Sequence, residues 1–555
     1  MTDDQGYGDL ACHGNPIVKT PHLDRLHADS VRLTNFHVDP ACAPTRAALM
    51  TGRYSHRAGV WHVVLNPSTL RAGERTMAEV FAAGGYRTAL FGKWHLGDNY
   101  PYRPQDRGFQ EVITFGGGVV GHTPDYWLND YFDDHYLHNG RWQRFPGYCT
   151  DVWFEQAIQF ARERKDRPCF IYLAVNAPHT PLQAPQTYLD RYAGLPEKTQ
   201  RFYAMITSID DNVGRLQAAL KESGLDRNTI LIFMTDNGSI DKTFAAGMRG
   251  NKASPYEGGH RVPCFVHWPA GGLTGGRDVA RLTAHFDLLP TLIALCALKQ
   301  PADVRFDGTD LSPLLRDKAG SWPERTLVVE WQGEIKPVKW QRSAVMTDRW
   351  RLVNGGELHD LAAAPDQSRN VAAGQPAVVK QLREAYERWW ADVSVRDDEV
   401  KEIPIGADAA NPARLTAYGW INATGKQADM PWAHVHIVAG PLQNGYWPLR
   451  VERAGRYEIR LRRWPEESGL AINDLSDAVP PEKSWHPVEA AQLVATRARV
   501  TIQDFDQTCP VDGKAREVSF VAALKPGSTK LQTWFLDDQG RSRGAYYAAI
   551  RRLDN

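Results

Sequence analysis

Residues 229–238, TILIFMTDNG, place a short apolar run directly before two polar side chains, Asp236 and Asn237. Two further segments have the same form and end in basic or imidazole side chains. They are YRTALFGKWHLG at 86–97, with Lys93 and His95, and FIYLAVNAPHTPL at 170–182, with His179. Short apolar runs that alternate with helical stretches such as MAEVFAAGG predict an α/β fold, with a mostly parallel sheet covered by helices on both faces.

In such a sheet the ligand site lies beyond the carboxyl ends of the strands. Asp3 and Asp4 fit the same pattern, because MT precedes them as MT at 234–235 precedes Asp236. Their strand is reduced to almost nothing, so we expect the true start of the chain upstream of Met1. Without that strand, a gap or a free sheet edge is expected beside the two aspartates.

The composition excludes several classes of function. The 555 residues contain 65 basic and 65 acidic side chains, so no overall positive charge indicates nucleic acid as a partner. No apolar run is long enough to span a bilayer. The seven cysteines form neither a dense disulfide pattern nor a paired zinc motif, and most are expected to be small core residues.

The residues at the strand ends form two chemical sets. The oxygen ligands are Asp3, Asp4, Asp236 and Asn237, and the cations or proton carriers are Arg46, Lys93, His95, His179 and Lys252. Three carboxylates and an amide suit a hard divalent cation such as Ca²⁺ or Mg²⁺, whereas histidine and cysteine ligands typical of zinc or copper are not clustered in the sequence. Together the sets suit a tetrahedral oxyanion ester. Individually, each residue also has an ordinary interpretation as a turn or loop residue.

Cys42 lies at the predicted start of a helix, in DPACAPTRAALMTGRY. Free N–H groups at a helix start favour an anion and lower the pKa of a thiol. An activated-thiol hydrolase is one interpretation and a buried structural cysteine is another. A thiolate is a poor partner for a hard cation, so an oxygen nucleophile at this position would be chemically more coherent.

The segment Cys42-Ala-Pro44-Thr-Arg46 resembles the C-x-P-x-R signature of the type I sulfatases, whose cysteine is oxidised after translation to formylglycine. Further segments of that family occur here in the family's order. They are DDQGYGDL, TPHLDRL, GKWHLG, APHTPL, TDNG and GNKASPYEGGHRVP, so that the resemblance covers about residues 1–400. It implies an alkaline-phosphatase-like fold, a Ca²⁺ ion and the hydrolysis of aryl or carbohydrate sulfates.

By this resemblance the metal ligands are Asp3, Asp4, Asp236, Asn237 and the modified residue 42. One hydroxyl of the formylglycine hydrate attacks sulfur, and the second then drives the release of sulfate. The resemblance also implies the other roles. Asp236 activates the attacking hydroxyl, His95 deprotonates the second one, Arg46 and Lys93 hold the formylglycine and the metal, and His179 and Lys252 contact the sulfate. Either of the last two could protonate the leaving oxygen.

Three domains are predicted: a catalytic domain at 1–320, a small α+β subdomain at 321–400, and a β-sandwich-like accessory domain at 401–555 whose function stays open. Residues 116–154 are rich in Trp, Tyr, Asp and His and are expected to be loop. Their aromatic rings could stack on a sugar or an aryl group, or simply pack the loop.

Other functions stay open at this point: a phosphatase or phosphonate monoester hydrolase on the same scaffold, or a carbohydrate-binding protein without activity. The expected partners are a sulfated glycan or small molecule and a formylglycine-generating maturation enzyme, without nucleic acid or membrane. The oligomeric state is unknown. The visible start carries no export signal, which predicts a cytoplasmic protein as written, or a periplasmic or secreted one if an upstream start carries a signal.

Overall fold

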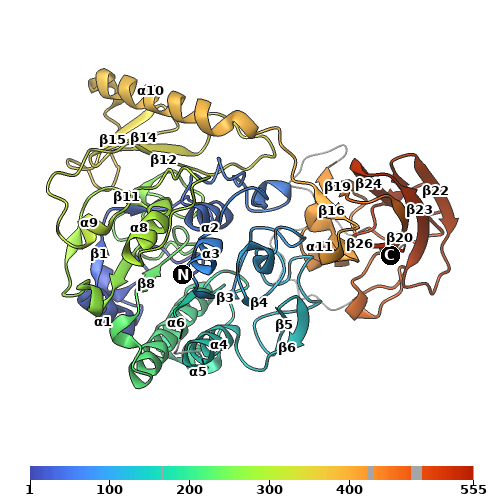
Figure 1. Ribbon diagram of the computed structural model, residues 1–555, viewed down its shortest axis with the longest axis horizontal. Coiled ribbons are helices and arrows are strands. Elements are labelled where there is room, and N and C mark those ends of the chain that lie inside the picture. Colours follow the sequence, from blue (N-terminus) through green and yellow to red (C-terminus); the bar gives the residue numbers. More distant parts are fainter. Residues whose placement is uncertain (164–166, 423–429, 477–490, 554–555) are drawn as a thin grey trace.

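The computed structural model describes residues 1–163, 167–422, 430–476 and 491–553 (Figure 1). Its first part is built on two neighbouring sheets. One has the order β6-β5-β4-β3-β7 and the other the order β10-β1-β9-β8. Their bounds are β3 (Arg87–Gly92), β4 (Glu111–Thr114), β5 (His135–His138), β6 (Arg141–Arg144), β7 (Cys169–Ala174), β1 (Val31–Leu33), β8 (Leu231–Met234), β9 (Cys264–His267) and β10 (Asp278–Val279). The sheets are mixed: β3 is parallel to β4 and β7, while β8 and β9 are antiparallel.

Met1 and Thr2 lie between these sheets, where the sequence predicts a gap. The Thr2 N–H donates to the Met234 carbonyl at 3.2 Å, and the Asp236 N–H donates to the Thr2 carbonyl at 3.1 Å. On the other side, the Val175 N–H donates to the Met1 carbonyl at 3.1 Å. These bonds join the edges of β7 and β8, so the following residues, Asp3 and Asp4, emerge at the carboxyl ends of both strands.

Helices cover both faces of the sheet, as the alternating sequence pattern predicts. Leu90 of β3 packs in one core cluster, whereas its neighbours Ala89 and Phe91 pack in another on the opposite face. The first cluster includes α2 (Cys42–Thr51), α3 (Met77–Ala83) and α8 (Leu288–Leu295), and the second includes α1 (Pro21–Asp29), α4 (Cys149–Glu163) and α6 (Glu197–Glu222). Shorter elements complete this part: β2 (Phe36–His37), β11 (Thr283–Ala284), α5 (Gln186–Leu189), α7 (Glu257–His260) and α9 (Ser312–Leu315).

A small antiparallel sheet follows, with one long helix across it (Figure 1). It contains β12 (Leu327–Glu330), β13 (Ser343–Met346), β14 (Trp350–Val353) and β15 (Glu357–Asp360), and the helix is α10 (Pro376–Val393). Leu382 and Tyr386 of the helix pack on Val345 and Leu352 of the sheet. The opposite face of the sheet packs against Ala48 of α2, so this unit supports the helix that begins at Cys42.

The C-terminal sheets form the β-rich region that the alternating sequence pattern predicts, and they lie at one end of the molecule (Figure 1). Their orders are β16-β19-β24-β21-β22 and β17-β26-β20-β23. The bounds are β16 (Ile403–Ile405), β17 (Ala413–Thr416), β18 (Ile421–Asn422), β19 (Gly445–Val451), β20 (Gly455–Arg462), β21 (Arg497–Ile502), β22 (Phe505–Pro510), β23 (Val518–Leu524), β24 (Gly527–Leu536), β25 (Ser542–Arg543), β26 (Tyr547–Arg552) and the helix α11 (His434–Ala439). Alternate residues of β20 are buried, which gives the two sheets a shared apolar core.

Residues 116–154 are only partly loop, so that expectation was wrong for the second half of the segment. β5 and β6 form a hairpin that extends the sheet next to β4, and α4 begins at Cys149. Tyr131, Tyr136 and Tyr148 are buried in the core that covers this face of the sheet. These three rings serve packing, because a buried ring offers no surface for stacking on a ligand. Within the described residues, no helix has the length and apolar character needed to cross a membrane.

A buried lysine, Lys401, lies just before the first strand of the C-terminal sheets. The Lys401 ammonium donates to the Gly59 carbonyl at 2.8 Å and lies 4.8 Å from the centre of the Trp61 ring. The Asn66 side chain donates to the Lys401 carbonyl at 2.8 Å and accepts from its N–H at 3.2 Å. The entry to the C-terminal sheets is therefore fixed to the loop at 59–66, which lies beside the strand ends.

Burial lowers the pKa of Lys401 to about 7, whereas lysine in an unfolded chain has a pKa of about 10.4. Between these values the unfolded chain binds more protons, so the stability of the folded state rises with pH. Relative to Lys401→Met, the wild type should gain at most about 1.4 kcal/mol in unfolding free energy per pH unit above about pH 7, as measured by urea denaturation. A difference that does not change with pH would show that Lys401 keeps an ordinary pKa.

Candidate active site

The structure brings the four predicted oxygen ligands together at the carboxyl ends of β7 and β8. The Asp4 N–H donates to Asp236 Oδ1 at 3.1 Å, and the Asn237 side-chain amide donates to Asp4 Oδ1 at 2.9 Å. Asp3 and Asp4 are 1% exposed, and Asp236 and Asn237 are fully buried. Asp4 has a φ of 63°, a left-handed conformation that is uncommon outside glycine and that is often retained at functional sites.

Cys42 is the first residue of α2 and faces this acidic group. Its Sγ and one carboxylate oxygen each of Asp3 and Asp236 all lie within 4.8 Å of one another. The N-cap residue, Ala41, has no side chain that could accept from the free N–H groups at the helix start. These N–H groups and the helix dipole therefore add positive potential next to residue 42.

Two buried cations neutralise the acidic group from the side of α2 and β3. Arg46, one turn after Cys42, donates from Nε and Nη2 to Asp236 Oδ2 at 3.2 and 2.8 Å. Its Nη1 donates to the Lys93 carbonyl at 3.1 Å, and Lys93 Nζ donates to Asp3 Oδ2 at 2.6 Å. Arg46 and Lys93 are both fully buried, so neither charge is screened by water.

His179 and Lys252 both contact Asp4. Nε2 of His179 lies 3.3 Å from Asp4 Oδ2, and Nζ of Lys252 lies 2.6 Å from Asp4 Oδ1. The Lys252 side chain is 21% exposed, whereas Asp4 is almost completely buried. Lys252 therefore lies at the rim of the polar group, where a ligand arriving from solvent would meet it.

His95 lies beside this group, although no hydrogen bond to the other predicted residues is seen in the described part of the chain. Its Nε2 lies 2.7 Å from the Val63 carbonyl, which can only accept, so this nitrogen carries the proton. Nδ1 is then left as a buried acceptor without a hydrogen-bond partner among the described residues. Gly118 packs directly on the ring, because a Cβ there would lie 2.0 Å from Nε2. Thus His95 has an available proton acceptor and a fixed position.

The buried charges shift the pKa values of the carboxyl groups in opposite directions. Burial and the neighbouring Asp3 raise the pKa of Asp236 to about 6, although Arg46 opposes this. Burial alone would raise the pKa of Asp4 as well, but His179, Lys252 and Lys93 lower it to about 2. The three aspartates are matched by three cations, Arg46, Lys93 and Lys252, so the side chains of the site are close to charge balance.

The prediction that the helix start lowers the pKa of the Cys42 thiol was wrong. Burial raises the pKa of this thiol, and Asp3 and Asp236 add to the increase, against the opposing effect of Lys93 and Lys252. The cost of burying a thiolate beside two carboxylates outweighs the helix dipole. As an unmodified residue, Cys42 is thus a neutral thiol and a weak nucleophile.

The donor set fits a hard divalent cation. Asp3 Oδ1 and Asn237 Oδ1 are buried and have no hydrogen-bond partner among the described residues, although buried polar atoms are usually paired. Both atoms, together with the Asp4 and Asp236 carboxylates, are oxygen ligands of the kind that Ca²⁺ and Mg²⁺ prefer. A cation among them would satisfy the two unpaired oxygens.

Sequence reasoning missed one group of residues next to the site. His122 contacts two rings of the C-terminal region, Tyr418 in the 3₁₀ helix η11 (Ala417–Gly419) and Trp432 just before α11, each at 5.2 Å between ring centres. The Tyr418 hydroxyl donates to the Val63 carbonyl at 3.3 Å, the same oxygen that accepts from His95. His122 falls within the 116–154 segment that the sequence singled out, but no pattern indicates its contacts with residues 300 positions later.

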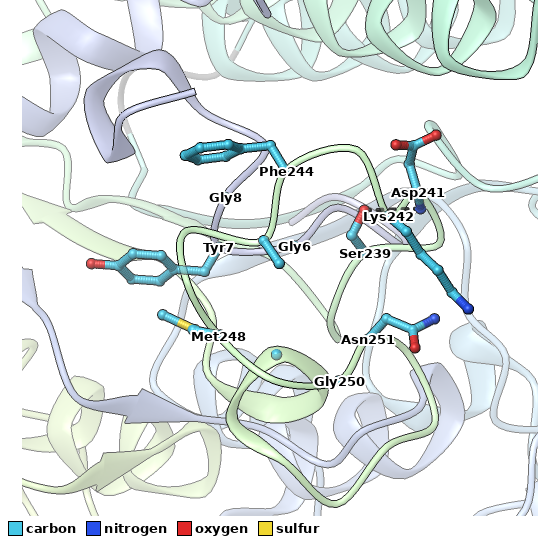
Figure 2. A pocket seen from close by; sticks show the side chains of 12 residues that line it. Gly6, Tyr7, Gly8, Ser239, Asp241, Lys242, Phe244, Met248, Gly250 and Asn251 are labelled. Atoms are coloured by element: carbon cyan, nitrogen blue, oxygen red, sulfur yellow. Dashed lines mark hydrogen bonds between the residues drawn. The ribbon is translucent and has the colours of Figure 1, made fainter. Parts of the chain in front are cut away.

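A cavity of about 290 Å³ adjoins the site (Figure 2). It lies between the glycine-rich turn at 6–8 and the loop at 239–251, and Tyr7, Lys242 and Asn251 are among its lining residues. The Lys252 N–H donates to the Ser239 carbonyl at 3.0 Å, so the loop that lines this cavity also holds Lys252. None of the ten predicted site residues is part of the lining. The cavity thus borders the site without containing it.

Two protein-family models match this chain. The Sulfatase family model matches residues 1–297, and a model described as N-sulphoglucosamine sulphohydrolase, C-terminal, matches residues 251–390. The chain belongs to the sulfatase family. Members of this family typically carry a formylglycine and a divalent metal. Human Arylsulfatase A is 33% identical over 69% of this chain and 80% of its own length. Mouse Arylsulfatase J is 32% identical over 67% of this chain and 66% of its own length.

Solved structures show the same fold in the catalytic part of this sulfatase. The structure described as Ps i-CgsB in complex with k-i-k-neocarrahexaose superposes with a TM-score of 0.63 and 27% identity, over 70% of this chain and 91% of that chain. A phosphonate monoester hydrolase, SpPMH from Silicibacter pomeroyi, superposes with a TM-score of 0.52 at 19% identity, over 71% of this chain and 95% of that chain, and shares the fold. The alkaline-phosphatase-like sandwich expected from the sequence is therefore confirmed.

Arg46→Ala should lower the unfolding free energy by about 3–5 kcal/mol, because it leaves the buried Asp236 carboxylate without its charged partner. Urea denaturation without added divalent cation measures this loss. Arg162→Ala is the control, since Arg162 forms an exposed ion pair with Glu222 at 2.9 Å and should cost at most about 1 kcal/mol. A loss at Arg46 no larger than the control would mean that Asp236 is not charged in the folded protein.

Proposed function

We propose that the protein hydrolyses sulfate monoesters. The observation that carries this proposal is the position of Cys42 at a helix start, with its Sγ within 4.8 Å of carboxylate oxygens of Asp3 and Asp236. Lys93 and Lys252 both act to lower the pKa of this thiol, so a nucleophile at this point would lie near fixed positive charge, which stabilises the charge that develops on a transferring oxyanion. Membership of the sulfatase family supports the same chemistry.

We further propose that a maturation enzyme, which supplies the oxidant, converts Cys42 to formylglycine. The hydrated aldehyde would supply two hydroxyl groups on one carbon, so that one can attack sulfur and the other can later expel sulfate. The net reaction adds one water across the ester bond. Asp236 is the carboxylate placed to take the proton of the attacking hydroxyl, and His95 Nδ1 is a buried acceptor that can take the second proton.

For the metal we propose Ca²⁺, held by Asp3, Asp4, Asp236, Asn237 and residue 42. When bound, the ion would neutralise negative charge on the transferring group. Arg46 and Lys93 fix the orientation of Asp236 and Asp3 through hydrogen bonds from buried cations. His179 and Lys252 lie on the side where the ester oxygens would bind, and one of them would donate the proton to the leaving alcohol.

The modified residue can be tested directly. Cys42→Ala should abolish hydrolysis of 4-nitrophenyl sulfate, because no other described side chain occupies the same place, while Cys264→Ala, another buried cysteine, should keep it. Peptide mass spectrometry of the wild type, produced together with a formylglycine-generating enzyme, should find an aldehyde at residue 42. An unmodified thiol in active protein would contradict the mechanism. Faster hydrolysis of 4-nitrophenyl phosphate would instead favour a phosphatase on this scaffold.

For the substrate we propose a sulfated carbohydrate. Tyr418 and Trp432 of the C-terminal region lie against His122, and Tyr418 shares the Val63 carbonyl with His95. The Thr123 N–H donates to the Trp432 carbonyl at 3.0 Å, which fixes the C-terminal region to the catalytic part. These three rings are buried, so they hold the two parts together and leave contacts with a sugar to the cavity between them. The complex of the related Ps i-CgsB with an oligosaccharide supports this choice.

A second cavity lies at the same domain boundary. Its volume is about 590 Å³, and Trp94, Gly97 and Asp98, which are close to His95 in the chain, are among its lining residues. Trp142 of β6 and Arg414 of β17 also line it. Aromatic, basic and acidic side chains in one cleft can bind the hydroxyl and sulfate groups of further sugar units. The cavity is thus large enough, and polar enough, for an oligosaccharide.

Trp142→Ala and Arg414→Ala should lower kcat/KM for the best of a panel of sulfated mono- and disaccharides by about tenfold or more, with a much smaller effect on 4-nitrophenyl sulfate, because they remove contacts to the sugar in this cavity. Trp534→Ala is the matched control, since Trp534 lies half-buried on β24 and packs only against Arg499 among the described ring contacts. Equal losses of kcat/KM on both substrate types would contradict sugar recognition by this cavity.

A further inference from the structure

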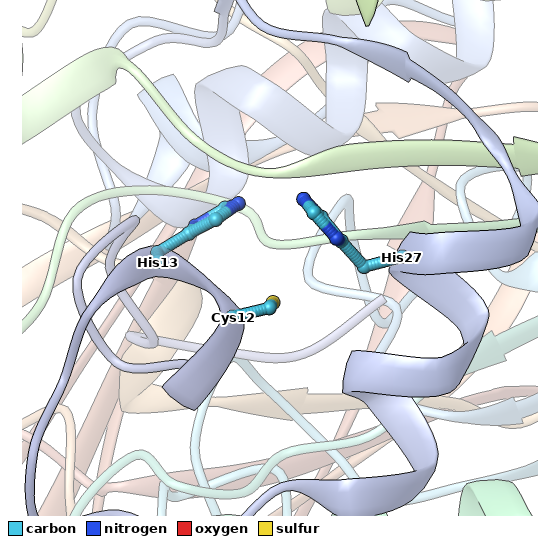
Figure 3. Close-up of side chains that lie close together, drawn as sticks. All are labelled: Cys12, His13 and His27. Atoms are coloured by element: carbon cyan, nitrogen blue, oxygen red, sulfur yellow. The ribbon is translucent and has the colours of Figure 1, made fainter. Parts of the chain in front are cut away.

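Three side chains with soft ligand atoms meet at a place that the reaction does not use. Cys12 and His13 belong to the 3₁₀ helix η1 (Ala11–His13), and His27 lies in the last turn of α1. One ligand atom from each lies within 4.8 Å of the other two, and Figure 3 shows the three side chains close together. All three are half-buried. We propose that they form a second metal site, for Zn²⁺ or a similar divalent d-block cation.

The residue types argue for this class of ion. One thiolate and two imidazoles are typical ligands of zinc, and they are not the oxygen ligands that Ca²⁺ prefers. Asp24 of α1 lies beside Cys12, because its Oδ1 accepts from the Cys12 N–H at 2.9 Å and from the Thr20 hydroxyl at 2.9 Å. Its carboxylate adds negative charge next to the three ligands, and water would fill the fourth position of a tetrahedral ion.

The His13 ring is held in the orientation that a metal ligand needs. Its Nδ1 lies 2.7 Å from the Tyr7 carbonyl, which can only accept, so Nδ1 carries the proton and Nε2 keeps its lone pair. The ring also stacks on Tyr7 at 3.9 Å between centres. A backbone carbonyl that fixes the tautomer is the usual second interaction of a metal-bound histidine.

The surroundings are apolar on one side and nearly charge-balanced on the other. The buried Phe265 ring lies edge-on to both His13 and His27, at 5.8 and 5.1 Å. Arg32 lies 3.4 Å from His27 Nδ1, and its charge is paired with Asp278 at 2.5 Å. The Cys12 thiolate and Asp24 would balance the two charges of the cation.

The position of the site indicates a structural role. It would link η1 to α1 and, through the Tyr7 carbonyl and ring, hold the turn that follows Asp3 and Asp4. Sequence analysis found no clustered histidine and cysteine ligands, because Cys12 and His13 are adjacent and His27 is fourteen positions away, a spacing outside the paired zinc motifs. Only the packing of α1 beside η1 brings them together.

Cobalt provides a direct test that does not depend on turnover. Protein stripped with EDTA and returned to Ca²⁺ is titrated with Co²⁺, and the thiolate-to-cobalt absorption band is recorded. We expect one Co²⁺ per chain with this band. Cys12→Ser should abolish the band, and His27→Gln and His13→Phe should weaken Co²⁺ binding at least tenfold. The phenyl ring of His13→Phe keeps the stacking on Tyr7, so this variant removes the ligand atom and little else.

Two other cysteine variants separate this site from other thiols. Cys42→Ser and the exposed Cys169→Ser should both keep the band. The proposal is overturned if no band forms, if the band survives in Cys12→Ser, or if Cys42→Ser removes it, since the cation would then lie in the catalytic site. His27→Gln provides the same test if Cys12→Ser does not fold, because His27 is on a half-exposed helix position. Zn²⁺ should also raise the Tm of the wild type and leave that of His27→Gln unchanged.

Discussion

The ion pair between Arg46 and Asp236 connects the parts of the molecule on which the site depends. Arg46 lies one turn after Cys42 on α2, and Asp236 follows β8, so two hydrogen bonds to one carboxylate oxygen fix the helix start against the strand end. Both side chains are completely buried. A buried pair of this kind contributes little net stability, but it is costly to separate, which makes the position of residue 42 hard to change.

Around this pair the structure gathers three buried carboxylates, each in contact with a cation. Lys93 and Lys252 each bind one aspartate, yet Asp3 Oδ1 and the side-chain oxygen of Asn237 have no hydrogen-bond partner among the described residues. An arrangement of this kind is unfavourable for the protein alone and becomes favourable with a divalent cation. Burial and the neighbouring carboxylates keep the unmodified Cys42 thiol neutral, and a neutral thiol is a weak nucleophile. The proposed oxidation would therefore make residue 42 reactive.

The sheets and the added C-terminal region bring distant segments to this point. Met1 and Thr2 join the edges of β7 and β8 and so place Asp3 and Asp4 beside Asp236. Tyr418 reaches the carbonyl of Val63, 355 positions earlier in the chain, where His95 also binds. The C-terminal sheets thereby take part in the surroundings of the site, although their sequence carries no motif that indicates a function.

The sequence by itself determined the α/β sheet and the polar residues that follow its strands, such as Lys93, Asp236 and Asn237, because apolar runs that end in polar side chains place those side chains at one edge of a parallel sheet. Cys42 and Arg46 lie on α2 and were predicted from the resemblance to a family signature. The sequence could not determine the pKa of Cys42, since burial beside two carboxylates outweighs the local effect of a helix start. Nor could it assign the tyrosines of 116–154 to the core or bring His122 to Tyr418. Contacts such as these, and the meeting of Cys12 and His13 with His27, depend on how separate elements pack, which only the tertiary structure decides.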